Sequence, residues 1–220
     1  MDDAEIMPEE IPSLLTKQEM AYRHLRSRIM SGELAPGNRI VIDTVAEALR
    51  MSAIPVREAL SHLAREGLVY VRPHVGATVA EIPPQAIAEI FALLEATELA
   101  GARLGLAAVD ESLLASMRNL CDRMERASDI PAWSGFNRAF HEALPRHAAL
   151  DRIVATMVKV GEDWQRLCNV NHEAASCQDI QVSNREHRTF IELLAAKELD
   201  SVERWISAHN QLALGRHRQD

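Results

Sequence analysis

The sequence predicts a mainly α-helical protein in which a winged helix-turn-helix precedes an all-helical antiparallel bundle. Three observations support this fold class. Residues 52–72 have the pattern of a recognition helix that leads into the first strand of a wing. Two adjacent prolines at 83 and 84 mark a domain boundary, because they end a strand and can begin a helix. Beyond them the apolar residues recur at helical spacing, without a strand pattern.

The composition is that of a folded protein, and 220 residues are enough for two modest domains. No run of about 18 uncharged apolar residues occurs, and the acidic N-terminus lacks the basic and apolar regions of a signal peptide. We therefore expect a cytoplasmic protein that does not enter a membrane. The three cysteines, Cys121, Cys168 and Cys177, match neither a disulfide framework nor a zinc ribbon, so we expect buried thiols.

Charge is distributed unevenly along the chain, whose net charge is −8. Residues 1–12 hold five acidic residues and no basic ones, and we expect a disordered acidic tail there. Residues 13–82 carry a net charge of +2, whereas residues 83–220 carry −5. A charge of +2 is small for a DNA-binding domain. We therefore expect two copies to bind one DNA site, with an affinity that falls steeply as salt increases.

Residues 13–82 are predicted to form the DNA-binding domain. Thr16 and Glu19 predict a capping box that begins a helix lasting to about residue 31. Residues 32–40 have the pattern of a turn, and Asp43 is expected to cap a short second helix over residues 44–50. After the third helix, extended segments at 68–72 and 78–81 flank a hairpin tip. The predicted order is three helices followed by a wing.

The third helix has the features of a recognition helix. Ser52 is expected to be its N-cap, and Gly67 ends it after an apolar stripe that begins at Val56. The face outside that stripe carries little acid and fits a major groove, where Arg57 would donate to a phosphate or a guanine. The predicted DNA-binding residues are Ser52, Ala53, Ile54, Arg57, Ser61, His74 and Gly76. His74 has a second interpretation, as a plain turn residue at the wing tip.

Residues 83–220 are predicted to form the helical bundle. We expect helices near 84–108, 110–127, 132–145, 149–171, 180–197 and 200–215. Asp110 and Asp200 are the expected caps of the second and the sixth. The last two helices are joined by a short loop near residue 198, so they form an antiparallel hairpin.

Three histidines in this half are spaced so that they can converge. His187 and His209 each lie eleven positions from the centre of the hairpin, which puts them at the same height. Asn137 and His141 share one face of a third helix, because they are separated by four residues. Each histidine taken alone would be interpreted as a hydrogen-bonded core or surface residue. Together the three predict a ligand site for zinc, nickel, copper or iron.

The N-terminal motifs resemble those of a known family. The segments YRHLRSRIMSGELAPGNRI, VAEALRMSAIPVREALSHLAREGLV and GATV are similar to the winged helix of the GntR superfamily. That winged helix is followed in the FadR subfamily by an all-helical FCD domain, and the likeness covers about residues 16–215. With six predicted helices, the second domain is more similar to the VanR-like branch than to the seven-helix branch. The resemblance implies a homodimeric transcription regulator, usually a repressor, that responds to a small metabolite, often a carboxylate.

The histidines also match a pattern of that family. Metal-binding FCD domains use Asp-x3-His, then a histidine in an EHR-like context, then a histidine in the final helix, and NRAFH, EHR and SAH follow this layout. The chain departs from the pattern at Asn137, where the family usually has Asp. The implied ligand set is neutral, so it should hold metal less tightly and leave the full charge of the ion to attract an anion.

Other positions depart from the family in ways that affect DNA and effector binding. The family commonly has basic residues where Asp43 and Ala53 stand, which implies a different or relaxed operator, whereas the arginine at Arg57 is kept. Leu94 stands where many members have an arginine that binds an anionic effector. The candidates for lining the effector pocket are Trp164, Gln165 and Asn169, whose alternative interpretation is that they are packing residues of their helix. Glu95 and Glu98 are expected to be solvated or to lie between subunits.

The predicted function is a ligand-responsive DNA-binding transcriptional regulator. Its expected partners are double-stranded operator DNA, a small carboxylate and a second copy of the chain. Zinc or nickel is the expected metal. One alternative is a metal sensor in which the ion itself is the signal. A metal-dependent hydrolase is the other alternative, because three histidines with an open position also hold catalytic zinc. It is disfavoured because no general base has an HExxH-like spacing, so we expect no enzyme.

Overall fold

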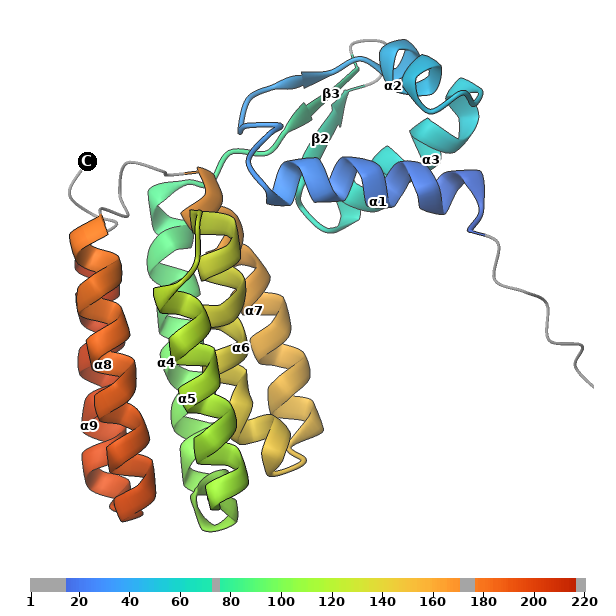
Figure 1. The fold of residues 1–220 in the computed structure, drawn as a ribbon. Coiled ribbons are helices and arrows are strands. Elements are labelled where there is room, and N and C mark those ends of the chain that lie inside the picture. Colours follow the sequence, from blue (N-terminus) through green and yellow to red (C-terminus); the bar gives the residue numbers. More distant parts are fainter. Residues whose placement is uncertain (1–14, 73–75, 171–176, 217–220) are drawn as a thin grey trace, which may run out of the picture. The chain divides into compact units, whose positions relative to one another are not determined.

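A computed structural model describes residues 15–72, 76–170 and 177–216 of the chain. Its contacts divide the described residues into two compact units, one holding residues up to 27 and 38–80, the other residues 28–37 and those from 81 onward. The predicted fold class is confirmed, because a small winged helix precedes an all-helical bundle (Figure 1). The hairpin tip at 73–75, with His74, lies outside the described residues.

The N-terminal unit combines three helices with a small antiparallel sheet. The helices are α1 (Lys17–Met30), α2 (Ile42–Ala48) and α3 (Ala53–Arg65), and the strands are β1 (Arg39–Ile40), β2 (Val69–Arg72) and β3 (Gly76–Val79), in the order β1-β3-β2. Strand β1 was predicted to be part of a turn, and that prediction is wrong. Arg39 pairs with Thr78 and Ile40 with Ala77. Two residues are too short to show an alternating pattern, so the sequence carries no signal for this strand.

The predicted helix caps of this unit are only partly correct. Thr16 Oγ1 accepts a hydrogen bond from the backbone N–H of Glu19 at 3.1 Å, as a capping residue should. The Glu19 carboxylate pairs instead with Arg23, at 2.6 Å. Asp43 does not cap the second helix, because α2 already begins at Ile42 and Asp43 lies in its first turn. A carboxylate there still stabilises the positive end of the helix dipole.

Helix α3 buries one stripe and exposes the opposite face. Val56, Ala59, Leu60 and Leu63 are buried, which removes apolar surface from water at about 25 cal/mol per Å². Ser52 occupies the N-cap position without a side-chain hydrogen bond to the helix. After the helix the backbone turns at Gly67, whose φ of +76° suits a residue without a side chain.

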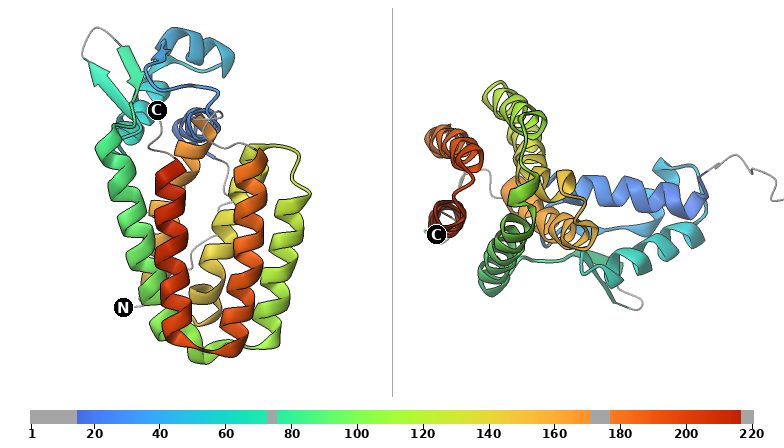
Figure 2. Two further views of the ribbon diagram at one scale, coloured as in Figure 1. Left: turned by 90° about the vertical axis from the view of Figure 1, so that its left-hand side faces the viewer. Right: turned by 90° about the horizontal axis from the view of Figure 1, so that it is seen from below.

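The C-terminal unit is a bundle of helices. Its described helices are α4 (Pro84–Gly105), α5 (Glu111–Glu125), α6 (Ile130–His147), α7 (Asp151–Val170), α8 (Cys177–Ala196) and α9 (Leu199–Arg216), with a short 3₁₀ turn, η1 (Leu106–Ala108). In the left view of Figure 2, α4, α9, α8 and α5 lie side by side in that order. Helix α6 packs on α4, α5 and α7, and α7 also packs on α4. The bundle interior therefore lies between two groups of helices. One group consists of α4, α5, α8 and α9, and the other consists of α6 and α7.

Two of the bundle helices have clear carboxylate caps. Asp110 accepts a hydrogen bond from the N–H of Leu113 at 2.9 Å, as predicted for the second helix of the bundle. Asp129 caps α6 in the same way, with Ala132 as the donor at 2.8 Å, although the sequence analysis did not predict it. The prediction that Asp200 caps the last helix is wrong, because α9 begins at Leu199 and Asp200 lies in its first turn.

Cys121 and Cys168 are buried free thiols in the bundle. Burial raises the pKa of the Cys121 thiol to about 11 and raises that of Cys168 as well, so both stay protonated at neutral pH. The side chain of Cys177 lies outside the described residues. Among the helices that the structure describes, none is long and apolar enough to cross a membrane.

Candidate metal centre and DNA-binding surface

Three imidazole rings meet in the middle of the bundle. His141 comes from α6, His187 from α8 and His209 from α9, so both groups of helices contribute. The ring centroids are 5.2 Å apart for His141 and His187, 5.4 Å for His141 and His209, and 5.1 Å for His187 and His209. One nitrogen from each ring lies within 4.8 Å of the others. His187 is fully buried and His209 is 7% exposed, so this cluster is shielded from solvent.

The helical hairpin explains why residues 22 positions apart face each other. Helices α8 and α9 run antiparallel on either side of residues 197 and 198, so His187 and His209 come to the same height. Trp205 lies one turn before His209 and stacks on its ring, with centroids 4.6 Å apart. Phe140 packs against the His187 ring at 4.5 Å. These aromatic contacts restrict the rotation of both imidazoles.

Asn137 lies on α6, one turn before His141, and is 4% exposed. Its Oδ1 atom is buried and accepts no hydrogen bond from residues 15–72, 76–170 or 177–216. A buried carbonyl oxygen without a partner costs free energy, on the order of 1–3 kcal/mol. Asn137 and His141 line the same cavity. The amide oxygen is therefore available as a further ligand to an ion in that cavity.

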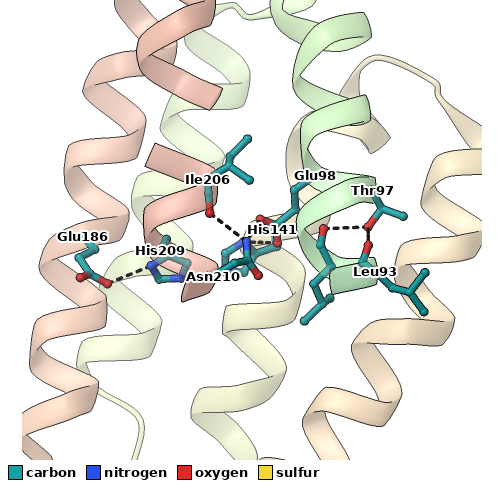
Figure 3. A network of polar contacts seen from close by, with 9 residues as sticks. Leu93, Thr97, Glu98, His141, Glu186, Ile206, His209 and Asn210 are labelled. Atoms are coloured by element: carbon teal, nitrogen blue, oxygen red, sulfur yellow. Dashed lines mark hydrogen bonds and ion pairs between the residues drawn. The ribbon is translucent and has the colours of Figure 1, made fainter. Parts of the chain in front are cut away.

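Two of the imidazoles are held by carboxylates (Figure 3). His141 Nδ1 lies 3.0 Å from Glu98 Oε1, and His209 Nδ1 lies 2.9 Å from Glu186 Oε2. An ionised carboxylate only accepts hydrogen bonds, so each Nδ1 is the donor. The other nitrogen of each ring, Nε2, is then left with its lone pair when the ring is neutral. That is the form in which histidine binds metal.

The burial of Glu98 corrects the expectation that this side chain is solvated or lies between subunits. It is 8% exposed, and its Oε2 accepts a hydrogen bond from Asn210 Nδ2 at 2.9 Å. The same Asn210 nitrogen donates to the carbonyl oxygen of Ile206 at 3.1 Å. Sequence reasoning missed Glu98 because its partners lie on α6 and α9, far along the chain. Glu95, one turn earlier, is only partly buried.

Electrostatics at the cluster favour the ionised form of Glu98 and the neutral form of His209. Burial by itself raises the pKa of Glu98, but His141, His209 and Asn210 outweigh this effect and hold the pKa below its usual value. Burial lowers the pKa of His209, although Glu186 opposes the shift. Glu98 is therefore charged at neutral pH, while His209 has a free lone pair to offer.

A cavity extends from the histidine cluster along the bundle interior. Its walls come from α4, α6, α7, α8 and α9, and are mostly apolar or aromatic near Trp133 and Trp164. The polar or charged residues that line it are Glu98, Asn137, Arg138, His141, Glu142, Ser183, His209 and Asn210. Leu94, at the position where the family often has an arginine, is also in the lining.

The three predicted pocket residues of α7 have different positions. Trp164 lines the cavity, and its ring lies 6.1 Å from that of Trp133. Gln165 is half-buried and lies next to Gly135, away from the described lining. Asn169 is 2% exposed and is also outside that lining, and its Oδ1 accepts a hydrogen bond from Ser134 Oγ at 3.3 Å. Of the three, Trp164 is the residue positioned to touch a ligand.

The predicted DNA-binding face lies on the surface of the N-terminal unit. Ser52, Arg57 and Ser61 are exposed, and Ile54 is 66% exposed, which is unusual for a large apolar side chain. Ala53 and Gly76 are half-buried. Arg57 also lines a hollow between α3 and the sheet. That hollow holds two further arginines, Arg39 and Arg72, which the sequence analysis did not single out.

Comparison with known proteins identifies the family. Residues 17–79 match the family described as bacterial regulatory proteins of the gntR family, and residues 89–212 match the FCD domain. The second match covers more than half of the chain. The chain belongs to the GntR regulators with an FCD domain. It is therefore a DNA-binding transcriptional regulator and not an enzyme, and the alternative of a metal-dependent hydrolase is wrong.

Similar proteins agree with this assignment. An uncharacterised HTH-type transcriptional regulator of Streptomyces ambofaciens is 34% identical over 132 residues, which span 60% of this chain and 56% of that relative. The HTH-type transcriptional repressor RspR of Escherichia coli is 25% identical over 196 residues, or 88% of this chain and 85% of that protein. The solved structure of E. coli McbR/YncC has a TM-score of 0.77 at 21% identity and covers 94% of this chain and 99% of that one. The structural likeness supports the fold of this GntR-family regulator.

Proposed function

We propose that this regulator is a homodimeric repressor that binds a divalent metal and a small organic acid in its helical domain. Residues 13–82 bind operator DNA, and residues 83–220 bind the ligands and join the two copies. The observation that carries the proposal is the convergence of three imidazoles on one point, with a nitrogen of each within 4.8 Å of the others. Such a set of neutral nitrogen ligands suits zinc or nickel.

The residues present fit such an ion. Zinc binds histidine nitrogen at about 2.0–2.1 Å, so tetrahedral ligands lie about 3.3–3.4 Å from each other. Nitrogens within 4.8 Å of one another would close on the ion by roughly an ångström through small side-chain rotations. Asn137 Oδ1 supplies a neutral oxygen nearby. Water or an oxygen of the effector completes the shell, and the ion polarises that oxygen.

The cavity supports a small carboxylate as the effector. Three of the proposed metal ligands, Asn137, His141 and His209, line its polar end, where a carboxylate oxygen would reach the ion. Its walls near Trp133, Trp164 and Phe91 suit a compact apolar body. Trp164 is the wall residue already expected from the sequence. Gln165 and Asn169 do not belong to the described lining, so we do not assign them direct contact with the effector.

Dimerisation and DNA binding are supported by exposed groups. On α4, Leu93 is 50% exposed and Leu104 is 66% exposed, and such apolar surface favours contact between copies. Two recognition helices in a dimer would reach half-sites about 34–36 Å apart on one face of DNA. Among the described residues, we assign six to the DNA-binding surface: Ser52, Ala53, Ile54, Arg57, Ser61 and Gly76. The named repressor among the relatives, RspR, supports repression as the direction of control.

A titration of DNA binding tests the proposal. Double-stranded DNA selected from a random library by the purified protein serves as the operator, and its affinity is measured by fluorescence anisotropy. The measurement is made with chelator, with zinc or nickel, and with metal plus propionate, benzoate or citrate. We expect at least one carboxylate to change the affinity roughly 5- to 150-fold only when metal is present, which corresponds to a coupling of about 1–3 kcal/mol.

The same titration distinguishes the metal sensor. If zinc or nickel alone shifts the operator affinity as far as metal plus any carboxylate, the ion is the signal and the cavity is not an effector site. If neither metal nor carboxylate changes the affinity, and no metal is retained, the proposed ligand response is contradicted. In that case the histidines are polar core residues of a regulator controlled in another way.

A further inference from the structure

Two carboxylates, Glu98 and Glu186, contact the rings of two proposed metal ligands. We propose that they are positioning residues of the metal site, which orient His141 and His209 and supply the negative charge that Asn137 does not. This inference rests on the proposed metal site, because it concerns side chains that act on the ion through its ligands. Glu98, which was expected to be solvated or to lie between subunits, is thereby assigned to positioning a metal ligand.

The two carboxylates fix the orientation of two imidazole rings. An imidazole on a helix can present either nitrogen to an ion, and a fixed hydrogen bond at one nitrogen selects the other. Glu98 accepts a hydrogen bond from His141 Nδ1 at 3.0 Å, and Glu186 accepts one from His209 Nδ1 at 2.9 Å. Both rings therefore direct Nε2 away from their carboxylates. A carboxylate that accepts a hydrogen bond from a metal-binding histidine is a common arrangement in metalloproteins.

Glu98 is held at both of its carboxylate oxygens. It lies on α4, whereas the histidines lie on α6, α8 and α9. One of its oxygens contacts His141 and the other accepts from Asn210, which is itself tied to the Ile206 carbonyl. The three bonds are drawn in Figure 3. Glu98 is thus fixed at both oxygens by residues of two other helices, and it links α4 to the site.

Glu186 is more exposed to solvent than Glu98. Its side chain is 21% exposed, whereas that of Glu98 is 7% exposed. A buried carboxylate interacts with a nearby ion more strongly than an exposed one, because less water screens the charges. We therefore expect Glu98 to contribute more to metal affinity than Glu186.

The two carboxylates also change the net charge of the proposed metal site. Three neutral imidazoles and an amide leave the ion with its charge of +2, which explains the expectation that the site would bind metal weakly and anions strongly. Two carboxylates, each one hydrogen bond behind a ligand, offset most of that charge within a few ångströms. They also increase the electron density on the coordinating nitrogens. The site should thus hold metal more tightly, and attract anions less, than its ligands alone indicate.

Metal affinity of charge-matched variants tests the inference. Glu98→Gln and Glu186→Gln keep the shape of the side chain but remove its charge. Glu95→Gln on α4 and Glu192→Gln on α8 remove the same charge at partly buried and exposed positions outside the described lining of the cavity. Affinity for zinc and for cobalt(II) is measured by competition with a chelator. We expect a loss of about 10- to 100-fold for Glu98→Gln, a smaller loss for Glu186→Gln, and less than a twofold change in the controls.

Two further measurements separate positioning from folding. Thermal unfolding in the presence of chelator reports the stability of each metal-free variant. The increase in stability when a fixed concentration of metal replaces the chelator reports metal binding. The partly exposed Glu186 provides a second test if Glu98→Gln does not fold. X-ray absorption of the zinc-loaded protein reports the number of imidazole ligands, the total number of ligands and the mean metal–ligand distance. We expect all three to be the same in the wild type and in both glutamine variants.

The outcomes are distinct. If the wild type binds neither zinc nor cobalt(II), the proposed metal site fails and this inference fails with it. If the wild type binds metal and both glutamine variants bind as tightly as the controls, the metal site stands and the positioning role is overturned. If the number of ligands or the mean metal–ligand distance in Glu98→Gln differs from the wild type, Glu98 is itself a ligand, which also overturns the role proposed here.

Discussion

Arg57 lies on the exposed face of α3 and lines a hollow together with Arg39 and Arg72. Arg57→Ala should weaken operator binding by about 1–3 kcal/mol per half-site, or roughly 5- to 150-fold, because it removes a donor to a phosphate or a base. Fluorescence anisotropy at several salt concentrations measures the loss. Arg65→Ala removes the same charge from the last turn of α3, outside the hollow, and serves as the control. Equal losses in the two variants would contradict the assigned recognition face.

Asn137 is the position where the chain departs from the usual aspartate of metal-binding FCD domains. Asn137→Asp should tighten zinc binding, because the buried amide oxygen without a described partner becomes a charged ligand. The same change should weaken binding of an anionic effector, since it cancels part of the field of the ion. Chelator competition and calorimetric titration with the effector carboxylate measure the two effects. A variant that binds both zinc and carboxylate more tightly would contradict this account of the site charge.

At the level of elements, the cap of α5 gives a pH-dependent contribution to stability. The Leu113 N–H, with a smaller contribution from His147, holds the pKa of Asp110 below its usual value of 3.8. A carboxyl group whose pKa is lower in the folded state stabilises the fold above its unfolded pKa, and this contribution is lost as the pH falls through the folded value. Wild type should therefore be more stable than Asp110→Ala at pH 7, and the difference should shrink below about pH 4.

Urea unfolding of both proteins in chelator at pH 7, 5 and 3 measures this difference. Glu111→Gln, in the exposed first turn of the same helix, controls for a general loss of negative charge near the helix N-terminus. A difference between wild type and Asp110→Ala that stays constant from pH 7 to pH 3 would show that the Asp110 charge has no part in the cap.

The elements that the sequence predicts well are those with a long periodic signal. The helices of the bundle and the recognition helix have apolar stripes over several turns, and the hairpin between α8 and α9 fixes the relative height of His187 and His209. Strand β1 has two residues and depends on its pairing with β3, so its formation is decided by tertiary contact. The misplaced caps at Asp43 and Asp200 differ from the observed helix starts by one or two residues, within the usual uncertainty of helix ends.

The sequence predicts only some of the residues of the candidate site. Residues on one helix or one hairpin have a fixed spacing, which is why Asn137 and the three histidines could be grouped. Glu98 meets His141 across 43 positions, and no local pattern predicts that contact. One signal was present, because an acidic residue among mostly apolar neighbours on α4 must find a partner if that face is buried. Arg39 was missed because β1 was not expected.

At the scale of the whole molecule, the bundle has its own hydrophobic core. Every buried member of that core lies at or beyond Ile90. A fragment of residues 84–220 should therefore fold by itself with a cooperative thermal transition, and it should form a dimer if the bundle joins the copies. Circular dichroism and analytical ultracentrifugation measure the two properties. A molten fragment would show that the bundle requires the N-terminal residues, including 28–37, which cluster with it in the full chain.

The central claim is that the bundle of this regulator binds one divalent ion through His141, His187 and His209. Native mass spectrometry of the full-length protein, after incubation with zinc or nickel at neutral pH, tests it most directly. The account predicts a dimer that carries one ion per chain, and a His209→Ala variant that remains dimeric but loses the ion. A wild-type dimer that stays free of metal in excess zinc and nickel would contradict the claim.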